Sequence, residues 1–458
     1  MTAIITDPFK KQLVQTVFQE VSFPDSASTH RYYLGIGKSE QWNNTETVPA
    51  ATDTPRSIRN VRAGLQSIKS ANDVTFTIPR YNWSSGGIYS AYDDDFSAIP
   101  TNSYYVLTED NQVYICLQQG KSSTGAPSTS TVKPSGTTTK PFKTGDGYVW
   151  KFLYTLSAAR ASKFLSANFV PIESILDSAT LGRSHTVLEN QQLLVQDASV
   201  PGQIIGIAVT DGGTGYTSTP TVTIIGDGVR AAATATVAAG AIVKIELDSS
   251  TDSTMTMGQG YKFANVIFNS GAATARAIIG PDSGMGNDPR DELKSTSLMF
   301  NTKPAGIEDS NFVIGQDFRQ VALIRDPKKN VADSDFTNAS GKVLSFLKLT
   351  ATANGSFLDA TITGGTSGAK ALVDEVDSDR IYFHQTEFTG FKPFTEGEAI
   401  SGGGVSGTLV AAGVDADADA FTKDDVNKLS GKILYIENRA PVTRSANQTE
   451  DIKVVITL

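Results

Sequence analysis

The chain has 458 residues and a formal net charge of −9, with 39% hydrophobic and 19% charged residues. This acidic total argues against a broad basic surface, so we expect no nucleic-acid partner. The 40 glycines indicate a folded, turn-rich protein of several domains. No apolar run is long enough to span a bilayer and no signal-peptide pattern opens the chain, so we expect no membrane partner. The only cysteine, Cys116, excludes intramolecular disulfides and predicts a small core residue.

Two amphipathic helices are predicted near the start of the chain. Asp7 and Pro8 look like an N-cap and a first-turn residue, and apolar residues follow at helical spacing, namely Phe9, Leu13, Val14, Val17, Phe18 and Val21. The pair Thr54 and Pro55 predicts a second helix, with an apolar stripe formed by Ile58, Val61, Leu65 and Ile68.

The next part of the chain is predicted to form an antiparallel sheet. Short apolar or alternating runs lie at 32–36, 74–78, 104–107 and 113–117, and residues 109–111 form a hairpin turn between the last two. Residues 121–140 are too polar to bury a core, so we expect a long exposed loop that a partner would order. The turn Asp146-Gly147 then starts a strand with a core-facing aromatic row, namely Tyr148, Trp150, Phe152 and Tyr154.

From about residue 200 the composition shifts to Gly, Ala, Thr and Val, and internal repeats appear. The segment from Gly215-Tyr216 to 233–237 is echoed from Gly260-Tyr261 to 273–277, and 364–373 is echoed at 402–410. We expect each repeat to be a small β-hairpin module that stacks on its neighbour. The final strand, 452–458, alternates and should place Ile452, Val454, Ile456 and Leu458 on one inward face.

These features predict a mainly β protein with a few helices (α+β), built from antiparallel β-sandwich-like core domains. The core is expected to be discontinuous, with residues 1–200, 300–345 and 421–458 forming two associated subdomains. Residues 201–299 and 346–420 are interpreted as two inserted Gly-rich β modules.

Catalytic and cofactor motifs are weak. Gly35 to Ser39 end like a phosphate-binding loop, but Tyr32 stands where that motif needs its first glycine. Asp415, Asp417 and Asp419 are spaced like calcium ligands, but Ala420 replaces the turn glycine, and a solvated linker is favoured. Asp93, Asp94 and Asp95 are interpreted in the same way, as a solvated charged turn. His30, His185 and His384 are far apart in sequence and no nucleophile elbow occurs, so we expect no enzyme, metal or cofactor.

Five segments carry a family resemblance. They are LGIGKSEQW (34–42), FTIPRYNW (76–83), TGDGYVWKFLYTL (144–156), FRQVALIRDP (318–327) and GKILYIENRAPVTRSANQTEDIKVVITL (431–458). In this order they resemble the gene-eight baseplate wedge proteins of T-even-type contractile-tailed phages. The motif residues are interpreted as structural, and they are Gly37, Trp42, Pro79, Arg80, Trp83, Gly145, Asp146, Gly147, Tyr148, Trp150, Arg319, Tyr435, Glu437, Asn438, Arg439 and Pro441.

The resemblance implies a virion structural subunit without catalytic residues. Such a subunit is assembled in the host cytoplasm, resides in the tail baseplate, and is present as two copies in each wedge. Its expected partners are a second copy, other wedge proteins, and tail-fibre or pin proteins at the inserted modules. A carbohydrate- or receptor-binding tail module is the alternative, and a baseplate-borne cell-wall hydrolase is a third reading.

Overall fold

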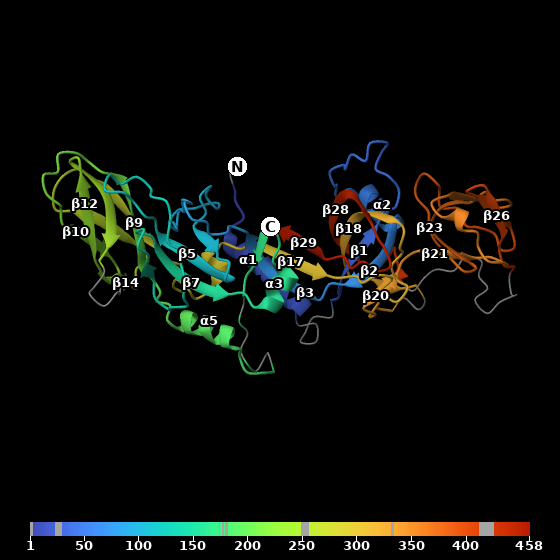
Figure 1. Cartoon of the computed structure of the whole chain (residues 1–458), viewed down its shortest axis with the longest axis horizontal. Helices are drawn as coiled ribbons and strands as arrows, with labels where there is room; N and C mark the ends of the chain where they lie inside the picture. Colours follow the sequence, from blue (N-terminus) through green and yellow to red (C-terminus); the bar gives the residue numbers. More distant parts are fainter. Residues whose placement is uncertain are drawn as a thin grey trace. The chain divides into compact units, whose positions relative to one another are not determined.

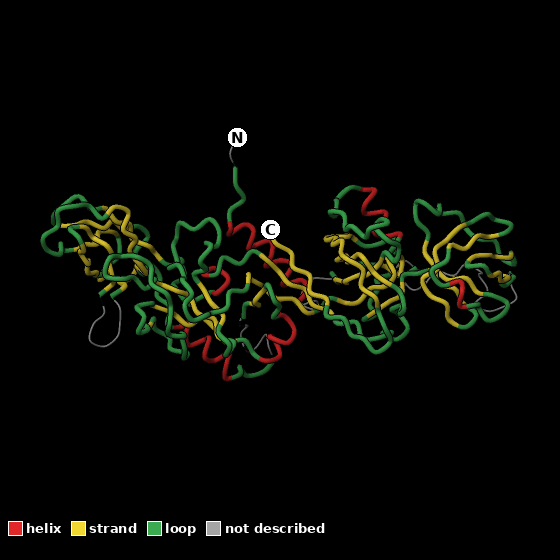
Figure 2. Tube along the Cα trace, turned by 45° about the horizontal axis from the view of Figure 1, so that its top comes forward, coloured by secondary structure: helices red, strands yellow, loops and turns green. Residues whose placement is uncertain are grey.

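The computed structural model describes residues 3–22, 30–173, 175, 178, 182–248, 256–330, 334–411 and 426–458. Strands predominate over short helices, and the ladders between neighbouring strands are antiparallel (Figures 1 and 2). The expected mainly β, α+β class is therefore confirmed. Among the described residues, no helix is both long and apolar enough to cross a membrane.

The chain divides into two compact units, and each unit is assembled from separate stretches of sequence. Unit 1 contains Met1–Lys11, Thr75–Met299 and Thr457–Leu458. Unit 2 contains Gln12–Val74 and Phe300–Ile456. The finer domain boundaries at 200, 300, 345 and 421 stay predictions.

A four-stranded sheet with two buried faces is the centre of unit 1. Its order is β4 (Tyr105–Leu107), β5 (Gln112–Gln118), β7 (Val149–Thr155) and β6 (Phe142–Lys143). The hairpin between β4 and β5 is confirmed, and Asn111 adopts the positive φ of 58° that its turn requires. The predicted aromatic row is fully buried, and its Tyr148, Trp150 and Phe152 pack around Cys116.

Three short helices accompany this sheet in unit 1. They are α3 (Ala158–Phe164), α5 (Val187–Asp197) and α6 (Pro289–Glu292). A capping box starts α5, because the Thr186 hydroxyl accepts from the amide of Glu189 while the Glu189 carboxylate accepts from the amide of Thr186. Val195 on α5 joins the aromatic core. The sequence reading did not identify these three helices.

A second four-stranded sheet contains the last strand of the chain. Its order is β29 (Ile452–Thr457), β17 (Ser297–Thr302), β3 (Asp73–Pro79) and β8 (Phe169–Pro171). The inward face predicted for β29 is confirmed at Ile452 and Val454, which are buried. It is wrong at Leu458, which lies beyond the strand and is 46% exposed.

The first Gly-rich block, within unit 1, forms its own set of sheets. Its strands are β9 (Ile204–Asp211), β10 (Val222–Gly226), β11 (Val229–Ala231), β12 (Ala233–Ala238), β13 (Ala241–Leu247), β14 (Met257–Gln259), β15 (Ala264–Phe268) and β16 (Thr274–Ile279). The pairs are β10 with β15, β15 with β16, β16 with β9, β12 with β13, and β11 with β14.

The two repeats of this block exchange contacts with each other. The second repeat is a hairpin of β15 and β16, as expected, whereas the expected hairpin is wrong for the first repeat, because β10 pairs with β15 and β12 pairs with β13. Equivalent strands pair directly, with Val222 opposite Phe268 and Ile224 opposite Val266. The exchange continues in the side chains, because the Tyr216 hydroxyl donates to the carbonyl of Ser270 at 3.1 Å. Gly271 packs on the same ring, where an added Cβ would lie 2.2 Å away. Each repeat thus completes the fold of the other.

Unit 2 is built on a five-stranded sheet. Its order is β20 (Ser340–Lys342), β2 (Leu65–Ser70), β1 (Tyr32–Gly37), β18 (Asp317–Arg325) and β28 (Lys432–Thr443). The short strands β19 (Lys328–Lys329) and β27 (Val426–Asn427) pair beside it. Tyr33, Val61, Ile68 and Ile324 belong to its core.

The structure contains both predicted helices, but the buried face of the first and the end of the second differ from the prediction. α1 (Asp7–Ser22) buries Val14 and Val21, but Phe9 and Leu13 are 56% and 45% exposed, so the predicted stripe is wrong over the first two turns. α2 (Pro55–Ala63) is capped by the Thr54 side chain as expected. It ends before Gly64, and Leu65 and Ile68 belong to β2 instead.

The second Gly-rich block, within unit 2, forms one six-stranded sheet. Its order is β21 (Ser345–Lys348), β24 (Arg380–His384), β23 (Lys370–Asp377), β22 (Thr361–Gly364), β25 (Ala399–Gly402) and β26 (Val405–Thr408). The short helix η1 (Gly355–Phe357) contributes Phe357 to its core. The two repeats are hairpins, as expected, and they meet edge to edge through β22 and β25.

Candidate functional site

Three segments that carry the family resemblance form neighbouring strands in unit 2. Residues 34–42 include most of β1, 318–327 include most of β18, and 431–442 include most of β28. The strands lie in the order β1, β18, β28, with Gly37 opposite Gln320 and Gln320 opposite Asn438. Segments that are hundreds of residues apart in sequence therefore meet in one sheet.

Arg319 holds this arrangement together from β18. Its side chain is 4% exposed, and its guanidinium lies 2.8 Å from Oε1 of Glu46 and 2.9 Å from Oδ2 of Asp317. It also donates to the carbonyl of Ser39. The hydrogen bond from Arg319 lowers the pKa of the Glu46 carboxyl. Arg319 thus ties the loop after β1 to the sheet.

Other motif residues of unit 2 secure the same loop. The Trp42 indole donates to the carbonyl of Arg439 at 2.9 Å. Asn438 accepts from the Gln320 amide at 2.7 Å and donates to the carbonyl of Pro49 at 3.1 Å. Gly37 has no room for a side chain, since a Cβ would lie 2.4 Å from the carbonyl oxygen of Gly64.

The motif residues from Glu437 to Pro441 lie within a strand. β28 continues through these residues to Thr443, with Glu437 opposite Val321 on β18. Tyr435 donates to Glu437 at 3.2 Å along the strand. Pro441 is exposed on this edge strand, where a missing amide donor is tolerated.

The motif residues of unit 1 gather around Asp146. Its Oδ2 accepts from the amides of Thr131 and Val132, at 2.8 and 2.9 Å, and from the Ser130 hydroxyl at 3.1 Å. Burial raises the pKa of Asp146, but hydrogen bonds from Thr144 and these amides outweigh it and lower the pKa. Asp146 therefore fastens the 121–140 loop onto its own unit.

The prediction that this loop needs a partner for order is therefore wrong. The Tyr148 hydroxyl donates to the carbonyl of Ser128 at 2.7 Å, and the Trp83 indole donates to the Ser130 hydroxyl at 3.1 Å. Ser130 and Pro134 are buried. The loop has no regular secondary structure, but side chains from other segments hold it. The sequence did not predict these contacts.

The remaining motif residues of unit 1 are also structural. Arg80 donates to the carbonyl of Ser166 at 2.8 Å, and the carbonyl of Pro79 accepts from Tyr105 at 2.8 Å. Gly147 has φ of +87°, which a side chain would strain. Trp150 is fully buried. Nothing in the structure explains the glycine at Gly145, where a Cβ would meet only Val132 at 4.0 Å.

A buried charged cluster in unit 2 was missed by the sequence reading. His384, on β24, is fully buried, with Nδ1 2.5 Å from Oδ2 of Asp374 and Nε2 3.1 Å from Oε1 of Glu40. Oδ1 of Asp374 accepts from the hydroxyl of Ser39 at 2.8 Å and the amide of Gln66 at 3.1 Å. The cluster connects β23 and β24 to the segment after β1.

The protonation state of this cluster argues against catalysis by it. Burial lowers the pKa of His384, but the charge and hydrogen bond of Asp374, and then Glu40, outweigh it and raise the pKa to about 10. A protonated imidazole cannot act as a general base. Ser39 also bonds to the carboxylate rather than the imidazole, so the order of a serine-hydrolase triad is not present.

The acidic groups that could suggest metal binding are engaged or lie outside the described residues. Asp94 and Asp95 are exposed, as expected for a solvated turn, and Asp93 and Asp94 both pair with Arg276. Asp415, Asp417 and Asp419 fall outside the described residues. Within the ranges that the structure describes, no group of three histidine, cysteine or carboxylate side chains is arranged to hold a metal ion.

Comparisons with known proteins do not name a family for this chain. No family model matches it. No curated protein matches it at a significant level.

Proposed function

We propose that this chain is a structural subunit of a contractile phage-tail baseplate wedge. One observation carries the proposal: three of the segments that resemble gene-eight wedge proteins are the neighbouring strands β1, β18 and β28. A chance resemblance in short segments has no reason to coincide with adjacency in a folded sheet. In this role the chain would reside in the virion and act without catalysis or a cofactor.

The contacts of the motif residues support a scaffold role. Arg319, Trp42 and Asn438 direct their side-chain hydrogen bonds to other parts of the protein. Asp146 does the same in unit 1. Residues that serve a catalytic or binding centre typically retain unsatisfied polar groups or reach an open cleft.

Exposed apolar side chains support partner contacts at both Gly-rich blocks. In the first block Ile225, Phe263 and Ile267 are 53%, 64% and 46% exposed on or beside β10 and β15. In the second block Phe388 and Phe391 are 90% and 62% exposed. Exposed aromatic and aliphatic groups of this kind mark protein interfaces. We propose neighbouring wedge, fibre or pin proteins, and a second copy of the chain, as the partners.

Electron cryo-microscopy of the parent particle tests the proposal. We expect density for this fold in the baseplate, with two copies in each wedge. Density in the capsid, neck or sheath, or no density in the virion, would contradict it. Light scattering of the purified chain gives a second test of its association into a dimer, with the double variant Ile225→Asp and Ile267→Asp as a probe of the first block.

Carbohydrate binding is a second candidate, and a cavity in unit 2 favours it. This cavity has a volume of about 650 Å³ and is lined by Trp42, Phe388, Asn60, Gln320 and Thr389 among others. Aromatic rings beside amide and hydroxyl groups are a common sugar-binding combination. Glycan-array binding that Phe388→Ala abolishes and Phe391→Ala retains would support this function, and an array without binding would remove it.

A further inference from the structure

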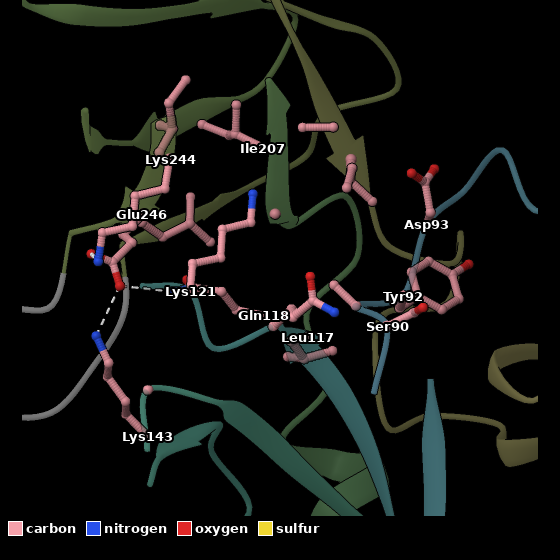
Figure 3. A pocket seen from close by; sticks show the side chains of 18 of the residues that line it. Ser90, Tyr92, Asp93, Leu117, Gln118, Lys121, Lys143, Ile207, Lys244 and Glu246 are labelled. Atoms are coloured by element: carbon pink, nitrogen blue, oxygen red, sulfur yellow. Dashed lines mark hydrogen bonds and ion pairs between the residues drawn. The ribbon is translucent and has the colours of Figure 1, made fainter. Parts of the chain in front are cut away.

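A cavity in unit 1 lies between the core sheet and the first Gly-rich block. It has a volume of about 270 Å³, and the end of β5, the following loop, β6, β9, β13 and β16 all contribute to its lining. Figure 3 shows lysine side chains at one side of it and Leu117 and Ile207 at the other. The volume is close to the lower end of the range for small-molecule sites, about 300 Å³.

The glutamate among these lysines, Glu246, is already contacted by three donor groups. Oε1 of Glu246 lies 2.8 Å from the Lys143 ammonium and accepts from the Gln118 amide at 2.9 Å. Oε2 lies 2.8 Å from the Lys244 ammonium. Burial raises the pKa of Glu246, but these three donors outweigh it and lower the pKa to about 2. Glu246 is therefore a full negative charge that two cations share.

Lys121 is the third lysine that lines the cavity, and it does not pair with Glu246. Lys143 and Lys244 point toward Glu246, whereas Lys121 points into the cavity toward Ile207 (Figure 3). Within the described ranges no hydrogen bond or ion pair of the Lys121 ammonium is found. Partial burial of this ammonium, followed by repulsion from Lys244, lowers its pKa, although much of the residue remains open to solvent. The folded protein thus holds this charge without a counter-ion.

The charges that line the cavity leave an excess of one positive charge. Lys121, Lys143 and Lys244 contribute three positive charges, and the two negative charges are those of Glu246 and of Asp93, which also pairs with Arg276. An anion in the cavity would offset the unpaired charge. It could also bond to Lys244, because an ammonium group has three donors and Glu246 takes one.

An apolar wall faces these cations. Leu117 at the end of β5, Ile207 and Ala208 on β9, and Ile278 on β16 line it. A bare inorganic ion would leave this wall in contact with water. A ligand with a compact body beside its charged group would cover the wall and gain from the hydrophobic effect.

We propose that this cavity binds a small organic anion, with its carboxylate or phosphate group at Lys121 and Lys244 and its body against Leu117, Ile207 and Ile278. The proposal is independent of the baseplate assignment, because it uses residues of the first Gly-rich block and the core sheet alone. A monosaccharide that carries a uronate or a phosphate group has a suitable size and charge. Titrations with glucuronate and with glucose 6-phosphate distinguish a carboxylate ligand from a phosphate ligand.

Isothermal titration calorimetry on the full chain tests the proposal with four probes. These are glucuronate, glucose 6-phosphate, neutral glucose and inorganic phosphate. We expect saturable binding of one or both sugar anions, weaker binding of inorganic phosphate, and no binding of glucose. Absence of binding by both sugar anions, or equal binding of glucose, would overturn the site. Inorganic phosphate that binds as well as the sugar anions would overturn the role of the apolar wall.

Three variants locate the binding. Lys121→Met should weaken the sugar anion by roughly tenfold or more, since one charged hydrogen bond is lost. Ala208→Leu fills the cavity without changing charge and should also weaken binding. Lys262→Met removes the same charge from an exposed position in the same block and should leave the affinity unchanged. Wild-type affinity for Lys121→Met, or an equal loss for Lys262→Met, would reject the assignment, and melting curves confirm that each variant is folded.

Discussion

The Nδ1 atom of His384 lies 2.5 Å from Oδ2 of Asp374, and both side chains are fully buried in unit 2. Since Glu40 contacts the other ring nitrogen, the imidazolium is enclosed by two carboxylates. Buried charges of this kind are tolerated only when they are paired and hydrogen-bonded. The cluster therefore makes the second Gly-rich block dependent on the segment after β1.

Asp374→Asn is expected to destabilise the protein strongly. The change leaves the buried imidazolium with one carboxylate, and breaking a buried ion pair costs roughly 3–5 kcal/mol. Urea unfolding at neutral pH measures the loss. Asp377→Asn, at an exposed position of the same strand, is the matched control and should change the free energy of unfolding little. Equal effects of the two variants would contradict the interpretation.

The stability of unit 2 should fall in alkaline solution because of His384. Its pKa is raised from 6.5 to about 10 in the folded state, so the folded protein binds the proton more tightly. This contribution is fully present below pH 6.5 and is lost as the pH rises through about 10. Urea unfolding across this range should show a steeper decline for the wild type than for His384→Gln. Parallel declines would show that the residue is neutral in the fold.

Glu292 should add a second pH dependence, located in unit 1. Burial raises its pKa from 4.5 to about 8, so its contribution is present below pH 4.5 and is lost as the pH rises through about 8. Glu292→Gln keeps the group neutral and should reduce the loss of stability between these values. Glu189→Gln is the control, because the pKa of Glu189 is about 2 and its charge is constant over the same range. An unchanged slope for Glu292→Gln would contradict the shift.

Arg319→Lys should destabilise the protein although it conserves the charge. Lysine cannot reproduce the planar contacts of the guanidinium with Glu46 and Asp317, and we expect a loss of about 1–3 kcal/mol. Arg56 also contacts a glutamate through two nitrogens, but its side chain is 69% exposed. Arg56→Lys should therefore cost less stability than Arg319→Lys in the same denaturation experiment. A smaller loss of stability for Arg319→Lys than for Arg56→Lys would contradict this interpretation.

Asp146→Ala should release the 121–140 loop while the core sheet stays folded. The variant loses the acceptor for the amides of Thr131 and Val132, so local opening becomes easier. Thermolysin cleavage before Val132 should accelerate by roughly tenfold, which corresponds to a loss of about 1.4 kcal/mol in local stability. Asp110→Ala also lies near this loop but removes only a surface ion pair with Lys133. If Asp110→Ala accelerates cleavage as much as Asp146→Ala does, the role given to Asp146 is wrong.

Local sequence patterns predicted strands and their burial better than they predicted which strands pair and which side chains meet. The alternation from Tyr148 to Tyr154 identified β7, and the turn at Asn111 identified the hairpin, because both signals lie within a few residues. The apolar spacing at Leu65 and Ile68 suggested helix, but helix α2 ends at Gly64 and the spacing then serves a strand. Apolar periodicity alone cannot distinguish these outcomes over one turn.

Long-range pairings were beyond what sequence position could show. The sequence predicts no metal site at His384, because no other histidine or cysteine lies near it in the sequence. Its partner Glu40 follows β1, far from His384 along the chain. The repeat of 215–237 at 260–277 was visible, but a repeat does not reveal whether its copies form separate hairpins or pair with each other. The cluster around Asp146 was recognised as a motif, while its contact with the 121–140 loop emerged only in three dimensions.

The first Gly-rich block begins and ends at the same place in the fold, since the amide of Gly280 donates to the carbonyl of Gln203 at 2.9 Å. Strands of both repeats lie in one sheet in the order β10, β15, β16 and β9, so the block closes on itself. A segment with adjacent ends and internal closure can be spliced into or out of a surface turn as a single cassette. Such a cassette allows the surface that the block carries to change while the core sheet of unit 1 stays the same.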